Sequence, residues 1–348
     1  MPVPRSIRKL LLGFAVVLVV CLAAYLKFHH AKPVLEVVYA GNKQVTLWSS
    51  SAEIREVLAT LKYGERLDVL DHFQQEAQVR TASGQLGWVA ESDLLSVDLW
   101  QKMKDLESLA ASSPVEAHGS TRVISNLHVG PGRDSPRLRQ LAKGIPLEMF
   151  QRQPVEAPAP PAAQPAARTD EADANADAVP PAVKKEDWWL VRAHLADDSA
   201  VTGWVLGRFI DLDVPEPLPS YASSAGMKVT AWFELNRVPD QQGGERPQYL
   251  LVGTKGPEGQ PCDFTQLRVF TWGKQSQRYE TAFVASEFCG KLPVKITHMA
   301  GEPGFSFQDL TDAGAQQRVY QMHQTVVRRV KQPGEASGKS AKGKRPHG

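Results

Sequence analysis

Cysteine is scarce in this chain, with only Cys21, Cys262 and Cys289 among 348 residues. Three cysteines exclude a cysteine-rich miniature protein and any metal cluster held by cysteine alone. An excess of one charge is also lacking, because 40 Lys and Arg stand against 38 Asp and Glu. Nucleic-acid-binding proteins usually concentrate Lys and Arg, so we expect no nucleic-acid partner. The apolar fraction of 42% suffices for folded cores, and the length suggests two or three domains.

Charge is absent from one stretch near the N-terminus, residues 10–26, which has basic residues on both sides. Its 17 residues are at the lower limit for crossing a membrane, and they predict an uncleaved signal anchor within residues 1–31. The alternative is a cleaved signal peptide, whose apolar part is shorter and ends in small residues. Positive charge before the span favours a cytoplasmic N-terminus. The bulk of the chain is therefore expected outside the inner membrane, in the periplasm.

Two segments repeat each other at an offset of 80 residues without a gap. The first has Leu47, Leu61, Gly64 and Leu67, and the second has Leu127, Leu141, Gly144 and Leu147. Both then end in Val-Arg, a turn and Gly-Trp-Val, at residues 87–89 and 203–205. Alternating apolar residues between glycine-containing turns predict short strands. The sequence therefore predicts an internal duplication of an all-β unit.

This pattern resembles the bacterial SH3-like domain family, which runs from V-N-L-R-x-G-P-S through K-x-G and W-x-x-V-R to G-W-V. The second repeat, residues 121–213, matches it with Asn126-Leu127-His128-Val129-Gly130-Pro131, Trp189-Leu190-Val191-Arg192 and Gly203-Trp204-Val205. The first repeat, residues 37–96, is more divergent, with Ala77 where the family has an aromatic residue. The resemblance implies two small, partly open β-barrels. It also implies recognition of cell-wall peptides or proteins.

The connecting segments have compositions of their own. Leu99, Met103 and Leu106 have helical spacing and predict a short helix in the connection 97–120, followed by a linker. Residues 153–187 of the second repeat are rich in Pro and Ala without aromatic residues, Leu, Ile or Met. They predict a disordered insertion between the second and third strands of the barrel. The final residues, 333–348, predict a disordered basic tail.

Residues 219–332 predict a separate antiparallel β domain, because short apolar segments alternate with turn signals. The candidate strands are 228–235, 249–253, 267–272, 278–284, 294–299, 305–310 and 318–327. The last of these also fits a helix, and we prefer a strand because Thr325, Val326 and Val327 are β-branched. Overall the chain is expected to be mainly β.

Cys262 and Cys289 lie on either side of a predicted hairpin formed by residues 267–272 and 278–284. A hairpin brings residues at its open end close together, and paired cysteines outside the cytoplasm tend to form disulfides. We therefore predict a disulfide between them. Two free thiols are the alternative.

Residue patterns for catalysis and metal binding are weak. Cys262 with the downstream His298 could suggest a cysteine peptidase, but such a nucleophile is expected at the start of a helix, and Cys262 precedes a strand. Carboxylates such as Glu234, Asp263, Glu280, Glu287 and Asp309 have no diagnostic spacing. The histidines lack the spacing of a zinc helix, and no two cysteines stand two residues apart. We expect no catalytic residues, no metal and no cofactor.

The candidate ligand-binding residues are aromatic or lie beside aromatic residues: Trp188, Trp189, His128, Pro131 and Trp204. Neighbouring residues of a strand point to opposite faces, so one of Trp188 and Trp189 is expected to be buried and the other partly exposed. The alternative is that both pack. The tryptophans of the two Gly-Trp-Val segments are expected to be structural in both copies. Because of Ala77, we expect the first copy to be a weaker binder or a spacer.

Together these features predict a membrane-anchored scaffold of the cell envelope that binds a cell-wall peptide, peptidoglycan or a protein partner. The rival hypothesis is an envelope enzyme of the cell-wall hydrolase type, with its active site in residues 219–332.

Overall fold

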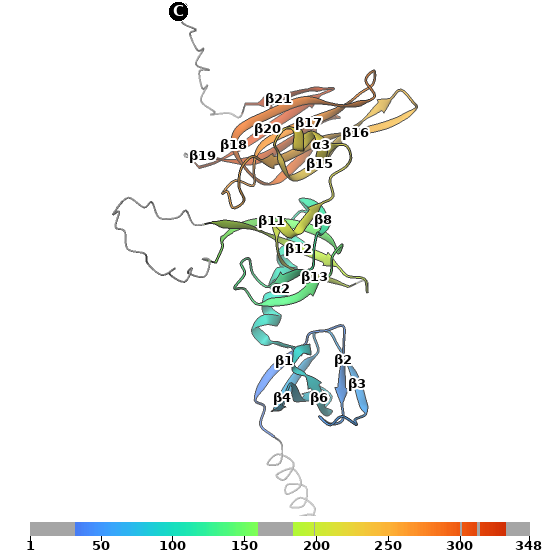
Figure 1. Ribbon diagram of the computed structural model, residues 1–348, viewed down its shortest axis with the longest axis vertical. Helices are drawn as coiled ribbons and strands as arrows, with labels where there is room; N and C mark the ends of the chain where they lie inside the picture. Colours follow the sequence, from blue (N-terminus) through green and yellow to red (C-terminus); the bar gives the residue numbers. More distant parts are fainter. Residues whose placement is uncertain (1–31, 159–183, 198, 300, 312–313, 332–348) are drawn as a thin grey trace, which may run out of the picture. The chain divides into compact units, whose positions relative to one another are not determined.

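The computed structural model describes residues 32–158, 184–197, 199–299, 301–311 and 314–331 (Figure 1). The predicted anchor, most of the predicted insertion and the predicted basic tail lie outside these residues. Within the described ranges, no helix has the length and apolar character needed to cross a membrane.

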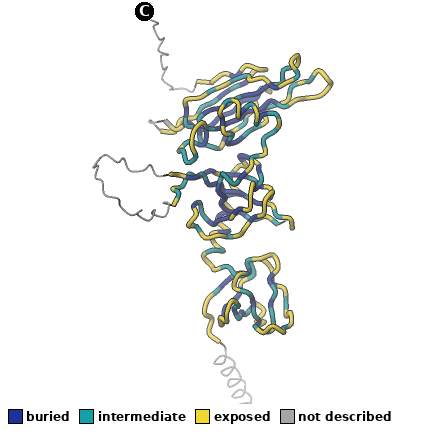
Figure 2. Tube along the Cα trace, in the orientation of Figure 1, coloured by how far each residue is buried: buried dark blue, intermediate teal, exposed yellow. Residues whose placement is uncertain are grey.

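The described part of the chain is mainly β, as predicted, and its strands form three seven-stranded antiparallel sheets. The described segments add two α-helices, α2 (Val97–Ser112) and α3 (Leu218–Ser224), and two short 3-10 helices at Glu91–Asp93 and Gly207–Phe209. The chain divides into two units between Lys102 and Met103, with the first sheet in one unit and the other two sheets in the second. Figure 2 shows buried residues along the strands of each sheet and exposed residues at the turns.

The first sheet surrounds a small apolar core. Its strands are β1 (Glu36–Ala40), β2 (Gln44–Trp48), β3 (Val57–Lys62), β4 (Arg66–Phe73), β5 (Glu76–Thr81), β6 (Leu86–Ala90) and β7 (Leu94–Ser96). They are ordered β3-β2-β6-β5-β4-β1-β7. Alternate residues such as Leu47, Leu67, Val79 and Val89 face the core and are fully buried. The alternation in the sequence therefore marks the inner face.

The second sheet repeats the strand order of the first. Its strands are β8 (Ala117–Thr121), β9 (Ser125–His128), β10 (Arg137–Leu141), β11 (Pro146–Glu156), β12 (Lys185–His194), β13 (Ala200–Leu206) and β14 (Ile210–Leu212). The order β10-β9-β13-β12-β11-β8-β14 is that of the first sheet with every label raised by seven. The predicted duplication is therefore present in the topology. We call the two copies the first and second modules.

The glycine of the Gly-Trp-Val segment has the same packing role in both modules. A Cβ atom on Gly87 would lie 2.6 Å from Cγ of Leu47, and one on Gly203 would lie 2.6 Å from Cγ of Leu127. Leu47 and Leu127 are the corresponding core residues, both fully buried. A larger side chain at either glycine would collide with its own core, which explains why the segment recurs.

Three expectations about the connections need correction. The first strand of the second module, β8, begins at Ala117, within the segment expected to be a linker. The predicted disordered insertion is strand at both ends, because β11 continues to Glu156 and β12 begins at Lys185. The insertion joins the fourth and fifth strands of its module rather than the second and third, since β11 and β12 pair over nine positions.

The third sheet is a meander in which each strand pairs with the next along the chain. Its strands are β15 (Lys228–Asp240), β16 (Gly244–Thr254), β17 (Phe264–Gly273), β18 (Arg278–Met299), β19 (Glu302–Thr311), β20 (Gly314–His323) and β21 (Val326–Val330). Two predicted strands, 278–284 and 294–299, are parts of the single long strand β18. The segment 318–327 is strand rather than helix, but a turn with Gln324 at φ 53° divides it into β20 and β21. Helix α3 was not predicted.

Cys262 and Cys289 are joined in a disulfide, as predicted, with their Cα atoms 4.8 Å apart. The β17–β18 hairpin brings them together, because Phe264 lies opposite Gly290 in its register. The backbone N–H of Asp263 also donates to the carbonyl of Gly290 at 2.9 Å.

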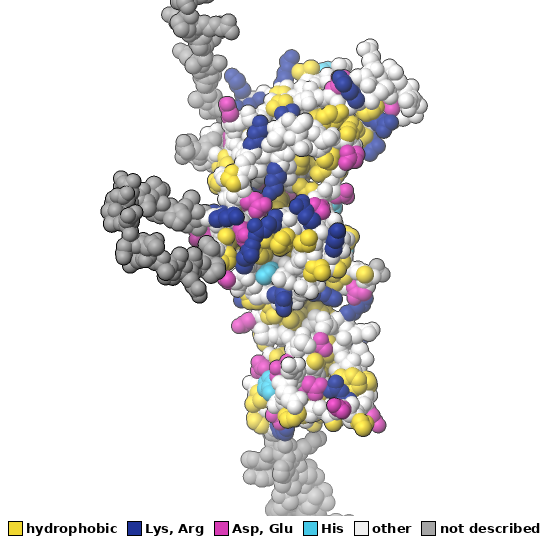
Figure 3. Space-filling model, in the orientation of Figure 1, with side chains coloured by type: hydrophobic (Ala, Val, Ile, Leu, Met, Phe, Trp, Pro, Cys, Tyr) yellow, Lys and Arg dark blue, Asp and Glu magenta, His cyan; other side chains and the backbone are white. Residues whose placement is uncertain are grey.

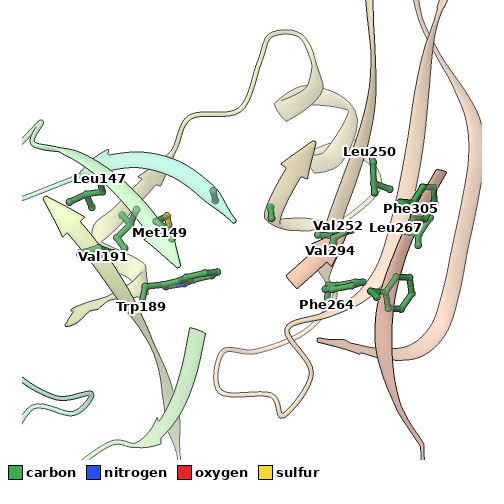
Figure 4. Close-up of a cluster of buried hydrophobic side chains, with 14 of the residues drawn as sticks. Leu147, Met149, Trp189, Val191, Leu250, Val252, Phe264, Leu267, Val294 and Phe305 are labelled. Atoms are coloured by element: carbon green, nitrogen blue, oxygen red, sulfur yellow. The ribbon is translucent and has the colours of Figure 1, made fainter. Parts of the chain in front are cut away.

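The second and third sheets share one buried apolar cluster. Figure 4 shows Met149 and Trp189 of the second module on one side of this cluster and Phe264 and Val294 of the third sheet on the other. The C-terminal sheet was expected to be separate, yet its core continues into that of the second module. This shared cluster positions the site described below.

Candidate binding surfaces

Trp188 and Trp189 are both buried, with 3% and 6% of their surface exposed. They point to opposite faces of β12, as strand geometry requires, but each face is covered. Trp188 packs in a cluster with Leu106 and Ala110 of α2, while Trp189 belongs to the cluster shared with the third sheet. The expectation that one of them remains partly exposed is wrong. The alternative, in which both pack, is confirmed.

The other predicted residues divide into a buried group and a loop residue. His128 lies opposite Trp204 in the register of β9 and β13, and its ring meets Trp188 edge-on at 5.2 Å. His128 and Trp204 are 9% and 4% exposed, whereas Pro131 is partly exposed in the connection between β9 and β10. The structure therefore brings His128, Trp188 and Trp204 together under α2. Their role in ligand binding stays a prediction.

The first module presents the corresponding aromatic side chains at its surface. Trp48 and Trp88 stand opposite each other at the positions of His128 and Trp204. Both are only half-buried, and Phe73, which is 51% exposed, meets Trp88 edge-on at 6.5 Å. Tryptophan in the Gly-Trp-Val segment is thus fully packed only in the second module. The first module, expected to be a weaker binder or spacer, is the one with accessible rings.

A pocket with a volume of about 240 Å³ lies where the second and third sheets meet. We call it the cleft. Its apolar wall includes Met149, Trp189 and Ile210 from the second module and Val229 from β15. Charged side chains also line it, and Figure 3 shows Lys and Arg beside Asp and Glu in this region. A cleft with an apolar wall and a few polar groups is the usual form of a ligand site.

Arg152 holds the two sides of the cleft together. Its guanidinium donates to Asp187 of β12 at 2.6 Å and to Asp263, just before β17, at 2.9 Å. It also donates to the carbonyl oxygens of Gln260 at 2.9 Å and Cys262 at 3.1 Å. The side chain is only 4% exposed, so this charge is buried and fully paired. Losing one partner of such a buried pair is costly, typically about 3–5 kcal/mol.

Sequence reasoning missed the cleft because its parts are distant along the chain. Arg152 and Asp263 are separated by 111 residues, and nothing local in either segment marks them as partners. Arg152 reaches its buried position only because the pairing register of β11 shifts between Met149 and Gln151, so simple alternation in the sequence does not mark it.

Four of the residues considered for catalysis, Cys262, His298, Asp263 and Asp309, have structural partners. Cys262 is in the disulfide, and Nε2 of His298 lies 3.0 Å from the carbonyl oxygen of Leu235. Asp263 pairs with Arg152 and Lys291, while Asp309 accepts from Arg318 and from the backbone N–H of Cys289. In the part of the chain that the structure describes, no three His, Cys, Asp or Glu side chains are grouped as they would be around a metal ion.

Comparison with known proteins gives no family. No family model matches the chain, and no curated protein matches it. A solved structure of NlpC2 from Trichomonas vaginalis aligns over 81% of this chain and 91% of its own, with 8% identity and a TM-score of 0.17. A similarity at this TM-score supports no argument about fold or function.

Proposed function

We propose that this protein is a membrane-anchored scaffold of the cell envelope that binds a cell-wall peptide in the cleft. The two modules are proposed to be SH3-like domains, and the strand order that they share supports their origin from one binding unit. The observation that carries the proposal is the cleft itself, since Arg152 fixes both of its walls and Trp189 supplies an aromatic surface within it.

The charges at the cleft suit a peptide with free amino and carboxylate groups, as cell-wall peptides have. Lys228 and Glu258 line the cleft and form an ion pair of 3.1 Å, and Arg122, also in the lining, pairs with Asp211 at 2.6 Å. The side chains of Lys228, Arg122 and Asp211 are more than half exposed. Exposed ion pairs contribute little stability, about 0–1 kcal/mol, so their exchange for a ligand's charges costs little. The apolar wall then holds the side chains of the peptide.

A cleft-filling variant tests this proposal. Thr254 ends β16 and lines the cleft, so Thr254→Trp places an indole in the space for the ligand. We expect retention of the full-length protein on purified cell wall to fall at least tenfold. The measurement is co-sedimentation with purified wall, in mild detergent because of the apolar stretch at residues 10–26.

The matched control is Thr297→Trp, at an exposed position of β18 outside the lining of the cleft. It adds the same surface aromatic residue and should leave retention unchanged. If Thr254→Trp is folded by circular dichroism and retained as well as the control, the cleft is not the binding site.

The proposed location has its own test. An alkaline phosphatase fused after residue 348 is active only outside the cytoplasm, so we expect activity in whole cells if residues 10–26 anchor the chain. Deleting these residues should abolish the activity. An inactive fusion, with the protein present in the cytosol, would contradict the periplasmic location.

A further inference from the structure

The charged side chains that line the cleft are balanced in sign. Three are cations and three are carboxylates: Arg122, Arg152, Lys228, Asp187, Glu258 and Asp263. Arg152 is buried, and its guanidinium already donates to Asp187 and Asp263. Because the two signs balance, net charge does not select a ligand. The choice depends on which hydrogen-bonding groups of the lining are still available.

Lys228 is poorly placed to bind an anionic group, although its side chain is exposed. Its Nζ lies 3.1 Å from Oε1 of Glu258, and both residues line the cleft. An anionic group that approaches Lys228 therefore also meets the carboxylate of Glu258. Like charges brought together at an interface are unfavourable, so Arg122 is the remaining candidate.

Arg122 differs from Lys228 because its counter-ion is not part of the cleft lining. Nε of Arg122 donates to Asp211 at 2.6 Å, and Asp211 does not line the cleft. Asp211 lies in β14 between Ile210 and Leu212, which both line the cleft. Since neighbouring side chains of a strand point to opposite faces, Asp211 points away from the side where Ile210 and Leu212 lie.

Arg122 is also held in position before any ligand binds. Its backbone N–H donates to the carbonyl oxygen of Phe209 at 2.8 Å, and Asp211 holds the guanidinium through Nε. This ion pair is exposed, so it adds little to stability, but it orients the guanidinium. A donor that is already oriented loses less conformational entropy on binding.

The two terminal nitrogens of Arg122 keep most of their donor capacity. Nη2 makes only a long contact of 3.5 Å with the carbonyl oxygen of Ile210, and Nη1 has no hydrogen-bond partner among the described residues. One hydrogen from each nitrogen can point at the two oxygens of a carboxylate, which is the bidentate contact that arginine favours. This contact leaves Asp211 on Nε. The side chain is 55% exposed, so a ligand can reach it.

We propose that Arg122 anchors a carboxylate of the cell-wall peptide in the cleft, through its two terminal nitrogens, while Asp211 orients the guanidinium from outside. This inference rests on the proposed function and adds which group of the ligand is recognised and by which residue. The carboxylate is either the C-terminal one or one within the peptide. Ile210 and Leu212 then contact the apolar part of the ligand beside it.

Amidation of the wall tests the inference. Purified cell wall treated with a carbodiimide and excess methylamine has its carboxylates converted to neutral amides. We expect the full-length protein, in mild detergent, to need at least tenfold more amidated wall than untreated wall for half-maximal co-sedimentation. Arg122→Gln should be weakened at least tenfold on untreated wall, and amidation should weaken it further by less than twofold. The two changes remove the same contact, so their effects do not add.

Arg139→Gln is the matched control. Arg139 is an exposed arginine of β10 outside the cleft lining, so its substitution removes the same charge elsewhere on the second module. This variant should bind untreated wall as the natural protein does, and it should lose at least tenfold on amidated wall.

Two synthetic peptides identify which carboxylate is bound. The parent competitor is L-Ala-γ-D-Glu-L-Lys-D-Ala-D-Ala, which has one internal and one C-terminal carboxylate and should displace the protein from untreated wall. One variant has an amide at the C-terminus, and the other has an amide in place of the internal carboxylate. A tenfold loss of competition marks the amidated carboxylate as the one bound. If both variants compete as well as the parent, the inference is overturned.

Failure of the inference differs from failure of the proposed function. Absence of retention on untreated wall, or of competition by the parent peptide, would contradict peptide binding in the cleft and the inference with it. Normal retention that is insensitive to amidation would overturn the inference alone. An Arg122→Gln variant that responds to amidation as strongly as the natural protein would do the same.

Discussion

Glu116 is the buried titratable residue with the clearest consequence for stability. It is 3% exposed, and burial raises the pKa of its carboxyl group to about 7 from an ordinary value of 4.5. The backbone N–H of Val294 donates to it at 3.4 Å, and the nearby carboxylate of Asp263 raises the pKa further. The carboxyl group therefore lies between the second module and β18 with one long hydrogen bond.

The sign of the pH effect follows from this pKa. Between pH 4.5 and about 7 the unfolded chain loses the Glu116 proton first, so the free energy of unfolding falls as pH rises. A pKa shift from 4.5 to about 7 corresponds to a full loss of about 3 kcal/mol. We expect Glu116→Gln to remove this dependence and to stabilise the protein at pH 8. Urea unfolding across pH 4.5–8 measures the free energy of unfolding of the natural protein and of the variant.

Glu107→Gln is the matched control, because Glu107 is exposed on α2. It should leave the pH profile as in the natural sequence. If Glu116→Gln instead lowers the free energy of unfolding at pH 8, the buried carboxylate stabilises the fold, and the predicted pH dependence is wrong.

The tryptophans show how far residue-level reasoning reaches. Alternation correctly placed Trp188 and Trp189 on opposite faces of a strand, because the side-chain direction of a strand is local geometry. The exposed fraction of a side chain, by contrast, depends on elements that are distant in the sequence. Leu106 of α2 covers one face, and the core shared with the third sheet covers the other. The expectation that the first module is a weaker binder or a spacer came from Ala77, and it stays a prediction.

At the scale of elements, the disulfide fastens the β17–β18 hairpin next to the cleft. Cys262 and Cys289 are 27 residues apart, and closing a loop of this size stabilises a protein by about 3 kcal/mol in the chain-entropy model. The loop that it holds supplies Gln260 and Asp263 to Arg152. We expect Cys262→Ser with Cys289→Ser to lower the free energy of unfolding by about this amount and to reduce wall retention.

Denaturant unfolding of the double variant measures the first effect, and co-sedimentation measures the second. Cys21→Ser should change neither, since Cys21 is not part of the disulfide. Equal unfolding midpoints for the oxidised and reduced natural protein would contradict the stabilising role.

Strand prediction succeeded where the signal was local and failed where pairing decided the outcome. The hairpin of β17 and β18 was predicted from apolar residues on both sides of a polar turn. β8 was missed because Ala117–Thr121 has no large apolar alternation, and its strand form depends on pairing with β11 and β14. Helix α3, with seven residues, is too short for a periodic pattern to show.

At the scale of the whole molecule, the chain contains two copies of one fold with different surroundings. In the second copy Trp204 is buried under α2, and the core continues into the third sheet. In the first copy the corresponding Trp88 is only half-buried. The second copy therefore has a packing role and also supplies one wall of the proposed cleft.

The sequence by itself determined the β character of this protein, its duplication and its disulfide, since each follows from alternation, repeated glycines or a local hairpin. Only the tertiary structure decided which faces are covered and where a cleft forms. The physical reason is that side chains alternate between the two faces of a strand, and this alternation does not specify what packs on either face. The contacts that decide this, such as Arg152 with Asp263, join residues 111 positions apart.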